Sequence, residues 1–131
     1  MPEPPKQPIV PGPVFDLVEF QGQVQLGNFY PYTTSAIRRV MAVYRGDMDD
    51  ARLIVQTIVC KLTEHDYVRS VRLDSGMLAD EYGKMFDDLG WYVKLLINRD
   101  DGEQDIVSCH LTKYPLTTRS ATIAAFDQNS D

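Results

Sequence analysis

Four side chains that can handle protons or phosphate lie at alternate positions of two strand-like segments. Tyr92 and Lys94 belong to the first segment, and Ser108 and His110 belong to the second. Cleavage of RNA through its 2'-hydroxyl needs a base for that hydroxyl, an acid for the leaving 5'-oxygen and a fixed cation for the charged phosphorane. The four side chains fit that chemistry. The outer face of a strand also carries such residues simply because they tolerate water, so a purely structural interpretation stays open.

These side chains can act together only if the two segments pair. Residues 91–98 and 105–111 are rich in aromatic and β-branched residues, which favours strands. A three-residue loop with Gly102 in the left-handed conformation is a common way to reverse the chain between them. The resulting register places the apolar residues on one face and the four polar residues on the other. It predicts the pairs Arg99 with Glu103, Leu96 with Ile106, Leu95 with Val107, Lys94 with Ser108, Val93 with Cys109, Tyr92 with His110 and Trp91 with Leu111.

Three helices are predicted ahead of these strands. The first covers residues 15–25 and ends at Gly27. The second begins at the capping residues 33–35 and ends at Gly46, which we expect in the left-handed conformation. The third begins with Asp47 as its N-cap, and its wide apolar stripe predicts the central helix of the core. Helices followed by strands predict an α+β domain whose helices pack on one face of an antiparallel sheet.

Two further segments complete the predicted organisation. The residues from Thr63 to Asp66 resemble a capping box, which predicts one more helical turn that carries Tyr67 and Arg69. Residues 1–13 hold six of the eight prolines and have no apolar periodicity. We therefore expect a flexible tail over residues 1–14, one domain over residues 15–116 and a C-terminal extension over residues 117–131.

Composition narrows the possible partners. The chain has 131 residues and a net charge of -6, which argues against nonspecific binding of nucleic acid over the whole surface. Residues 38–72 hold seven basic and five acidic residues, whereas residues 73–105 hold three basic and nine acidic residues. A polyanion is therefore expected to approach the first block. No apolar run reaches the roughly 18 residues of a membrane helix, so no membrane partner is expected.

The sequence shows no pattern for a cofactor or metal. It contains no Gly-rich phosphate loop and no metalloprotease or serine-hydrolase motif. The pairs Asp87-Asp88 and Asp100-Asp101 are interpreted as solvated loop charges, and His65 as a surface residue. Cys60 and Cys109 have no metal-ligand spacing, and free thiols fit a reducing cytoplasm.

Several short motifs follow one another along residues 15–111. They are Phe15-Asp16-Leu17 with Phe20-Gln21, Thr33-Thr34-Ser35-Ala36, Asp66-Tyr67-Val68-Arg69-Ser70-Val71, Asp80-Glu81-Tyr82, Tyr92-Val93-Lys94-Leu95 and Ile106-Val107-Ser108-Cys109-His110. This collinear set resembles the motility quorum-sensing regulator family of bacterial toxins, the MqsR-like mRNA interferases. The resemblance implies a RelE-like fold, ribosome-independent cleavage of mRNA and inhibition by a cognate antitoxin protein.

The resemblance also implies a site. The family's active-site lysine falls on Arg69, its strand tyrosine on Tyr92 and its terminal-strand lysine on His110, while its glutamine falls on Ala79. We therefore expect a metal-independent endoribonuclease that leaves a 2',3'-cyclic phosphate. The expected catalytic residues are Arg69 and Lys94, which hold and neutralise phosphate, and His110 and Tyr92, which handle protons or orient the scissile group. The expected RNA-binding residues are Tyr67, Tyr82 and Ser108.

A different class of function is also open. Ala79 in place of the glutamine and the net charge of -6 favour a catalytically inactive relative that serves as a binding module or regulator in a toxin-antitoxin or defence locus. In either case, residues 105–111 could pair with a strand of the antitoxin if they form a sheet edge. The acidic residues between 73 and 105 would then steer a basic partner surface.

Overall fold

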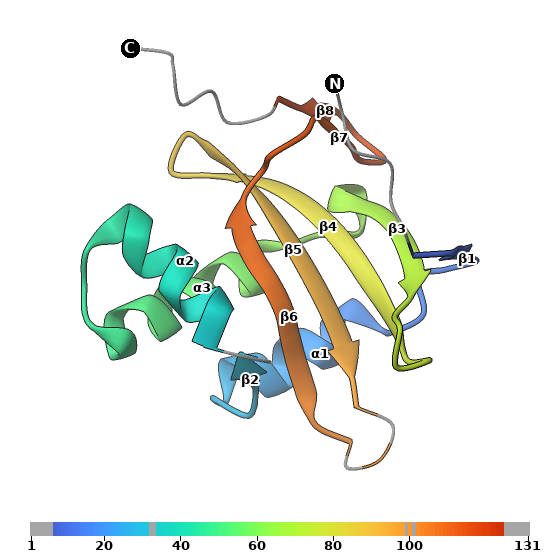
Figure 1. The fold of residues 1–131 in the computed structure, drawn as a ribbon, viewed down its shortest axis with the longest axis horizontal. Helices are drawn as coiled ribbons and strands as arrows, with labels where there is room; N and C mark the ends of the chain where they lie inside the picture. Colours follow the sequence, from blue (N-terminus) through green and yellow to red (C-terminus); the bar gives the residue numbers. More distant parts are fainter. Residues whose placement is uncertain (1–6, 32–33, 99, 101, 125–131) are drawn as a thin grey trace.

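The computed structural model describes residues 7–31, 34–98, 100 and 102–124. It confirms the α+β class, with three helices in the N-terminal half and a sheet formed mainly by the C-terminal half (Figure 1). The elements are β1 (Ile9–Val10), α1 (Leu17–Gln25), β2 (Tyr30–Pro31), α2 (Thr34–Tyr44), α3 (Met48–Lys61), the short 3-10 helix η1 (Glu64–Asp66), β3 (Tyr67–Arg72), β4 (Leu78–Phe86), β5 (Leu89–Ile97), β6 (Gln104–Leu111), β7 (Leu116–Thr117) and β8 (Thr122–Ile123).

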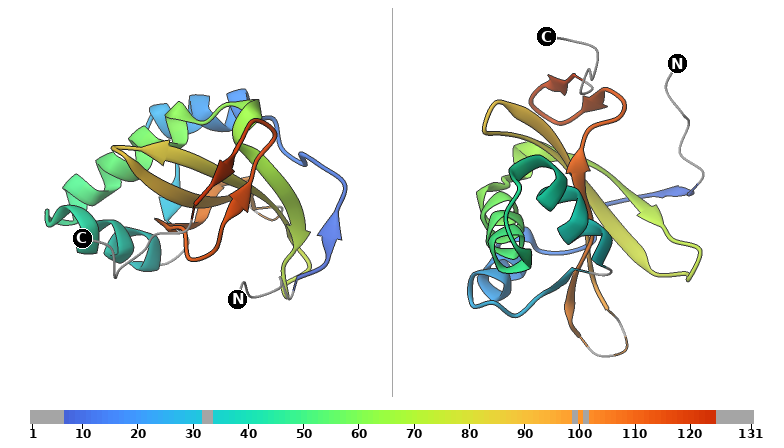
Figure 2. Two further views of the ribbon diagram at one scale, coloured as in Figure 1. Left: turned by 90° about the horizontal axis from the view of Figure 1, so that it is seen from above. Right: turned by 60° about the vertical axis from the view of Figure 1, so that its left-hand side comes forward.

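The sheet has the strand order β1-β3-β4-β5-β6-β2. The pairs β1–β3, β3–β4, β4–β5 and β5–β6 are antiparallel, whereas β2 pairs with β6 in parallel. Both outer strands are only two residues long and come from the N-terminal part of the chain. The helices gather on one side of the sheet (Figure 2). Strands β7 and β8 form a separate hairpin.

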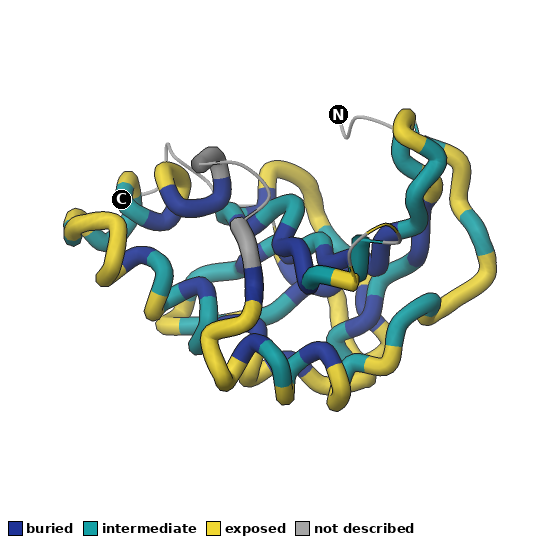
Figure 3. The backbone as a smooth tube through the Cα atoms, turned by 90° about the horizontal axis from the view of Figure 1, so that it is seen from below, coloured by how far each residue is buried: buried dark blue, intermediate teal, exposed yellow. Residues whose placement is uncertain are grey.

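The main core lies between the helices and the sheet. Helix α3 contributes Ala51, Val55, Ile58 and Val59, all buried, which confirms it as a central core helix. The buried positions of the sheet and helices are shown in dark blue in Figure 3. None of the helices in the described ranges is both long and apolar enough to cross a membrane.

The helix boundaries follow local signals with one correction. Asp47 caps α3 through its side chain, which accepts a hydrogen bond from Asp50 N at 2.8 Å, while the Asp50 side chain accepts one from Asp47 N. After α2 the left-handed residue is Arg45, with φ 54°, and not Gly46 as predicted. Thr33, one of the predicted caps of α2, lies outside the described residues.

The strand β3 was not predicted. The capping box at Thr63 is present, but the helix that it starts is only η1. Tyr67 then adopts an extended conformation, with φ -64° and ψ 134°, and begins a strand that pairs with β4. The expected helical turn carrying Tyr67 and Arg69 is therefore wrong. Pairing with β4 satisfies the backbone hydrogen-bonding groups of these residues and outweighs the local preference for a helix that the capping box creates.

The predicted hairpin register is correct at one end of β5 and β6. Where β5 begins and β6 ends, the partners are as expected: Trp91 with Leu111, Tyr92 with His110, Val93 with Cys109 and Lys94 with Ser108. The register then shifts, and the next partners are Leu95 with Ile106, Leu96 with Asp105 and Ile97 with Gln104. The predicted pairs Leu95 with Val107 and Leu96 with Ile106 are therefore wrong.

Two local features produce that shift. Asn98 N donates to Glu103 O at 2.8 Å, so the connecting loop has four residues, one more than predicted. Val107 is the extra residue of a β-bulge, which restores the predicted register beyond it. Gly102 has φ 72°, as expected for the left-handed position, while Arg99 lies outside the described residues.

The N-terminal segment from residue 7 onward is bound to the sheet rather than free as a tail. Ile9 and Val10 pair with Val71 and Ser70 of β3. The buried carboxylate of Asp80 accepts hydrogen bonds from the backbone N–H groups of residues 14 and 15 and from the Ser70 hydroxyl. The prediction of a flexible tail is wrong for this part. Residues 1–6 lie outside the described chain.

The start of the predicted C-terminal extension also packs on the domain. The β7–β8 hairpin covers the two glycines Gly83 and Gly90, where an added Cβ would lie 3.1 Å and 2.6 Å from atoms of Ile123. The predicted boundary at residue 117 therefore cuts through a hairpin that belongs to the fold. Residues 125–131 lie outside the described chain.

Candidate functional site

The face of the sheet that points away from the main core carries the polar residues. Tyr82, Val93 and Cys109 are buried in the main core with the helices. Since successive side chains of a strand point to opposite faces, their neighbours along β4, β5 and β6 lie on the other face. Cross-strand pairing aligns four of the outward residues in one row, Arg69, Glu81, Lys94 and Ser108, and a second row contains Gly83, Tyr92 and His110.

Glu81 is the centre of the first row. One carboxylate oxygen, Oε1, accepts a hydrogen bond from Arg69 Nε at 2.7 Å. The other, Oε2, accepts from the Tyr92 hydroxyl at 2.8 Å and lies 3.6 Å from Lys94 Nζ. Only 3% of the Glu81 side chain is exposed. Such a buried carboxylate needs these partners, because an unpaired buried charge is costly.

This network changes the predicted role of the two cations. Arg69 and Lys94 were expected to hold phosphate, but the buried carboxylate of Glu81 lies between them. The Lys94 side chain is only 11% exposed, and its Nζ also donates to Gln7 Oε1 at 3.0 Å. The pair retains one net positive charge against Glu81. Lys94 thus lies opposite Ser108 as predicted, whereas Arg69 reaches the same face from β3, and Glu81 reduces the attraction of both for an anion.

The network also fixes Tyr92 as a neutral donor. Burial raises the pKa of the Tyr92 phenol, and the adjacent Glu81 carboxylate raises that pKa further. The phenol therefore keeps its proton at neutral pH and donates a hydrogen bond to Glu81. In this arrangement Tyr92 orients neighbouring groups and cannot serve as a base.

His110 lies beside Tyr92 with one ring nitrogen engaged. The two ring centroids are 5.0 Å apart, and His110 Nδ1 lies 2.8 Å from Leu111 O. A carbonyl oxygen only accepts, so Nδ1 carries the proton of the neutral ring. Burial lowers the pKa of the imidazole, and the positive charges of Arg39, Lys113 and Lys94 lower it further against the opposing bond to Leu111. The neutral form therefore dominates at pH 7 and leaves the lone pair on Nε2.

A pocket of about 650 Å³ adjoins His110. Its polar rim holds two exposed cations, Arg39 of α2 and Lys113, which follows β6. Its walls hold the aliphatic side chains of Val43 and Leu89. The pocket can therefore receive an anionic group beside a neutral imidazole.

Sequence reasoning missed three residues of this site. Arg39 was counted only within the basic block 38–72, and Lys113 lay beyond the matched motifs. Glu81 was quoted within a motif and given no role. Strand alternation from Lys94 across to β4 could have found Glu81 had β4 been predicted. No local signal places Arg39 near His110, because the contact joins α2 to the end of β6.

The three predicted RNA-binding residues do not share one surface. Tyr67 and Tyr82 are buried, with ring centroids 5.8 Å apart in an edge-on contact inside the core. The structure therefore does not place these two predicted RNA-binding side chains where RNA could contact their rings. Ser108 is half-buried and lies opposite Lys94 on the polar face, as predicted. Ala79 is buried in a small second cluster with Val71 and Leu96.

The predicted docking edge is occupied. Tyr30 and Pro31 of β2 pair with Asp105 and Ile106 of β6, and α2 packs beside β6. Strand β6 is therefore not the edge strand of the sheet, and the expected addition of a partner strand along residues 105–111 is wrong for the part that β2 covers.

Comparisons with protein-family models, with curated proteins and with solved structures found no match. The resemblance to the MqsR-like toxins stays a prediction. Within the described ranges, no group of three or more His, Cys, Asp and Glu side chains is arranged to hold a metal ion. Both cysteines are free thiols, with Cys60 exposed and Cys109 buried.

Proposed function

We propose that this protein is an mRNA interferase, an endoribonuclease toxin of a toxin-antitoxin system that acts in the cytoplasm without a ribosome. The observation that carries the proposal is His110, a neutral imidazole with a free Nε2 beside a pocket rimmed by Arg39 and Lys113. An RNA phosphate held by these two cations would bring an adjacent 2'-hydroxyl to the imidazole. At this place a base lies beside two cations that form no ion pair among the described residues.

In the proposed reaction, His110 Nε2 accepts the proton of the RNA 2'-hydroxyl, and the 2'-oxygen attacks phosphorus. The bond from phosphorus to the 5'-oxygen breaks, and the leaving oxygen takes a proton from solvent at the exposed rim. The products are a 2',3'-cyclic phosphate and a 5'-hydroxyl. Arg39 and Lys113 offset the charge of the phosphorane. Tyr92 holds the His110 ring in place. Arg69 and Lys94 add only a weak attraction for the neighbouring RNA backbone, because Glu81 offsets part of their charge. Because the chain itself supplies a base and cations, the proposed reaction needs no metal.

The test is cleavage of a mixed-sequence RNA by the full chain in the presence of EDTA. His110→Ala should lower the rate by about 10²- to 10⁴-fold, the usual contribution of a general base. His65→Ala is the matched control, since the His65 side chain is 69% exposed and lies away from the pocket. It should cleave at the wild-type rate. Cleavage by His110→Ala at the rate of the control would reject the proposed base.

A second candidate is a non-catalytic binding module with the same fold. The buried network around Glu81 favours it, because that carboxylate reduces the attraction of Arg69 and Lys94 for phosphate. The two candidates differ on expression without a partner. Growth arrest that Arg39→Ala abolishes supports the toxin, whereas harmless expression and no RNA binding at low salt support the module.

We also propose a cognate antitoxin as the protein partner. The nine acidic residues between 73 and 105 would speed the approach of a basic partner surface, because charge complementarity acts mainly on association rates. Association with the product of the adjacent gene should slow as salt rises. No association at either ionic strength would reject the partner, and a salt-independent rate would reject the electrostatic steering.

A further inference from the structure

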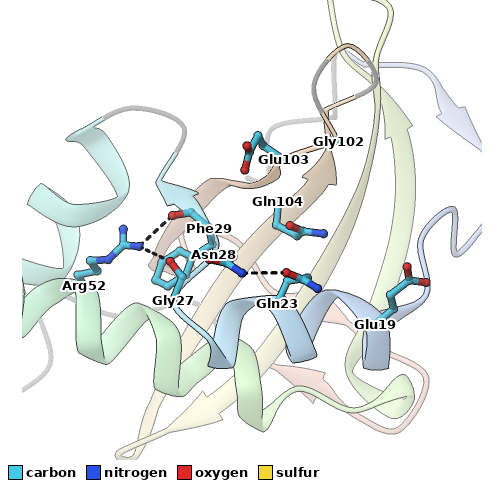
Figure 4. A pocket seen from close by; sticks show the side chains of 9 residues that line it. All are labelled: Glu19, Gln23, Gly27, Asn28, Phe29, Arg52, Gly102, Glu103 and Gln104. Carbon is cyan, nitrogen blue, oxygen red and sulfur yellow. Dashed lines mark hydrogen bonds between the residues drawn. The ribbon is translucent and has the colours of Figure 1, made fainter.

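Two pockets of similar size differ in their charge. The His110 pocket has a volume of about 650 Å³ and is lined by Arg39, Ala42, Val43, Leu89 and residues 110–113. The second pocket, of about 690 Å³, lies where α1 meets the loop between β5 and β6 and is shown in Figure 4. Its charged lining residues are Glu19, Glu103 and Arg52. Because two carboxylates oppose one cation there, an anion fits the His110 pocket better.

Among the described residues, no acidic side chain lines the His110 pocket. Its charged lining residues are Arg39 and Lys113, both exposed. The nearest acidic residues along the chain, Asp87 and Asp88, precede Leu89 in the turn between β4 and β5. Neither of them lines the pocket, and Asp87 Oδ2 accepts a hydrogen bond from the Tyr44 hydroxyl at 3.1 Å. The lining therefore carries two positive charges and attracts an anion.

The interior of the His110 pocket is aliphatic. The apolar residues that line it are Ala42 and Val43 of α2, Leu89 of β5 and Leu111 of β6. The last three of them also pack against the main core, which fixes their positions. Thr112 is only 1% exposed, and its hydroxyl donates to Ala124 O at 2.9 Å. The interior thus offers apolar surface and no free side-chain donor.

The spacing of the cation and the apolar wall suits one nucleotide. Arg39 lies near His110, because its positive charge lowers the pKa of the imidazole. Val43 follows four residues later on the same side of α2, about 6 Å further along the helix. About five covalent bonds separate the phosphorus of a ribose 3'-phosphate from the base nitrogen on the ribose, which spans about 6 Å at ordinary bond lengths. A phosphate at Arg39 therefore allows the base of the same nucleotide to reach Val43.

We propose that the His110 pocket binds the nucleotide that carries the attacking 2'-hydroxyl and accepts any of the four bases. This inference rests on the proposed ribonuclease function. The faces of the base lie against Val43, Leu89 and Leu111, and the 3'-phosphate lies between Arg39 and Lys113. The polar edge of the base stays toward the open rim, where water satisfies it. Because the interior has no free side-chain donor, the base is held by its apolar faces and its edge is not read.

The test is an NMR titration of the full chain with the 3'-monophosphates of adenosine, cytidine, guanosine and uridine. Inorganic phosphate is the probe without a base, and uridine is the probe without a phosphate. Backbone signals of Leu111 and Lys113 should shift and saturate with each nucleotide. Each nucleotide should bind at least about fivefold more tightly than inorganic phosphate, because only about 40 Å² of apolar surface must leave water to give that factor. Uridine should bind more weakly than its 3'-monophosphate, because it cannot bind the two cations.

Three variants complete the design. Leu89→Ala should weaken nucleotide binding by about three- to fivefold and leave the binding of inorganic phosphate unchanged, because it removes part of the apolar wall. Arg39→Gln should weaken the binding of both by about tenfold, because it removes a charge-assisted hydrogen bond. Leu53→Ala is the matched control, since that leucine is 61% exposed and does not line the pocket, and it should bind like the wild type. Arg39 is exposed too, so its variant keeps the test valid if Leu89→Ala fails to fold.

Three results would overturn the inference. One is nucleotide binding that is absent or less than about fivefold tighter than that of inorganic phosphate. Another is a difference of about tenfold or more among the four nucleotides, the usual effect of hydrogen bonds that read a base edge. The third is saturation of the same signals by octanoate while no nucleotide binds, which would identify a pocket for acyl carboxylates.

The same measurements separate this inference from the proposed function. Cleavage of RNA by the full chain, together with any of these three results, overturns the nucleotide pocket and leaves the ribonuclease in place. Binding of all four nucleotides as expected, together with no cleavage of RNA, supports the pocket and overturns the ribonuclease.

Discussion

Replacing Glu81 by glutamine removes the negative charge that lies between Arg69 and Lys94. Loss of one partner from a buried ion pair typically costs about 3–5 kcal/mol, because the other charge stays buried without compensation. Lys94 is nearly buried, with 11% of its side chain exposed, whereas Arg69 is 31% exposed and can turn toward water. Glutamine also keeps an oxygen that accepts from Tyr92. We therefore expect a loss at the lower end of that range, about 3 kcal/mol in the free energy of unfolding.

The same substitution should strengthen RNA binding. Without the Glu81 carboxylate, Arg69 and Lys94 become available to phosphate, so binding at low salt should tighten. The slope of log affinity against log salt should become steeper by about 0.7 for each phosphate newly contacted. Stability is measured by urea unfolding followed by tryptophan fluorescence with linear extrapolation. Binding is measured with a short single-stranded RNA at several salt concentrations.

Two variants serve as controls for this reasoning. Glu64→Gln removes an exposed carboxylate and should change stability by less than about 0.5 kcal/mol. Adding Lys94→Met to Glu81→Gln removes the stranded charge and should recover about 1–2 kcal/mol of the loss. A loss below about 1 kcal/mol in Glu81→Gln would refute the view that Glu81 stabilises buried cations. An unchanged salt slope would refute the placement of Arg69 and Lys94 in the path of RNA.

Three further predictions concern acid-base behaviour and packing. The pH profile of kcat/KM should rise through a pKa below the ordinary histidine value of about 6.5 and level off above that pKa, because only neutral His110 accepts a proton. A midpoint above the ordinary value would contradict the proposed base. Asp80→Asn should cost about 2–3 kcal/mol in urea unfolding and speed hydrogen exchange in β1, since the carboxylate accepts from two backbone N–H groups of the N-terminal segment. Gly90→Ala should lower the free energy of unfolding by about 1–3 kcal/mol and speed hydrogen exchange in the β7–β8 hairpin, because the new methyl group would collide with Ile123. The control is Gly22→Ala, where no atom lies within 4 Å of the new methyl group, and it should stabilise α1. Unchanged hydrogen exchange in β1 of Asp80→Asn would contradict the contact of Asp80 with the N-terminal segment. Unchanged hydrogen exchange in the β7–β8 hairpin of Gly90→Ala would contradict the contact of Gly90 with Ile123.

Sequence reasoning succeeded where the determining interactions are local. The N-cap at Asp47 depends on a hydrogen bond between residues three apart, and the start of α3 was predicted correctly. The left-handed position after α2 was assigned to Gly46, but Arg45 adopts it. Glycine adopts this conformation most readily, yet a side chain can be held there by the structure around it.

The hairpin register shows how two local errors can cancel. The loop is one residue longer than predicted, which shifts the pairing near the turn. The bulge at Val107 shifts it back, so Tyr92 still faces His110. Neither feature leaves a distinct pattern in the sequence. The pairing of Tyr92 with His110 was therefore predicted correctly through a register that is partly wrong.

The rest of the site depends on contacts between distant segments. Glu81 lies on β4, and that strand and β3 were not predicted as a pair, so no argument could bring its carboxylate to Arg69. Arg39 lies on an exposed turn of α2, where a charged residue needs no explanation. Only the packing of α2 beside β6 makes it part of the pocket.

The origin of the two outer strands has a consequence for synthesis of the chain. Strands β1 and β2 leave the ribosome before the strands that they flank, because β3 and β6 begin at Tyr67 and Gln104. When β3 and β6 are synthesised, the strands that pair with their outer edges, β1 and β2, are therefore already present in the nascent chain. Loss of the pairing by β1 and β2 would uncover part of each edge, and exposed edges recruit strands from other molecules. Strands β1 and β2 are thus made early enough to cover part of each sheet edge as soon as β3 and β6 emerge.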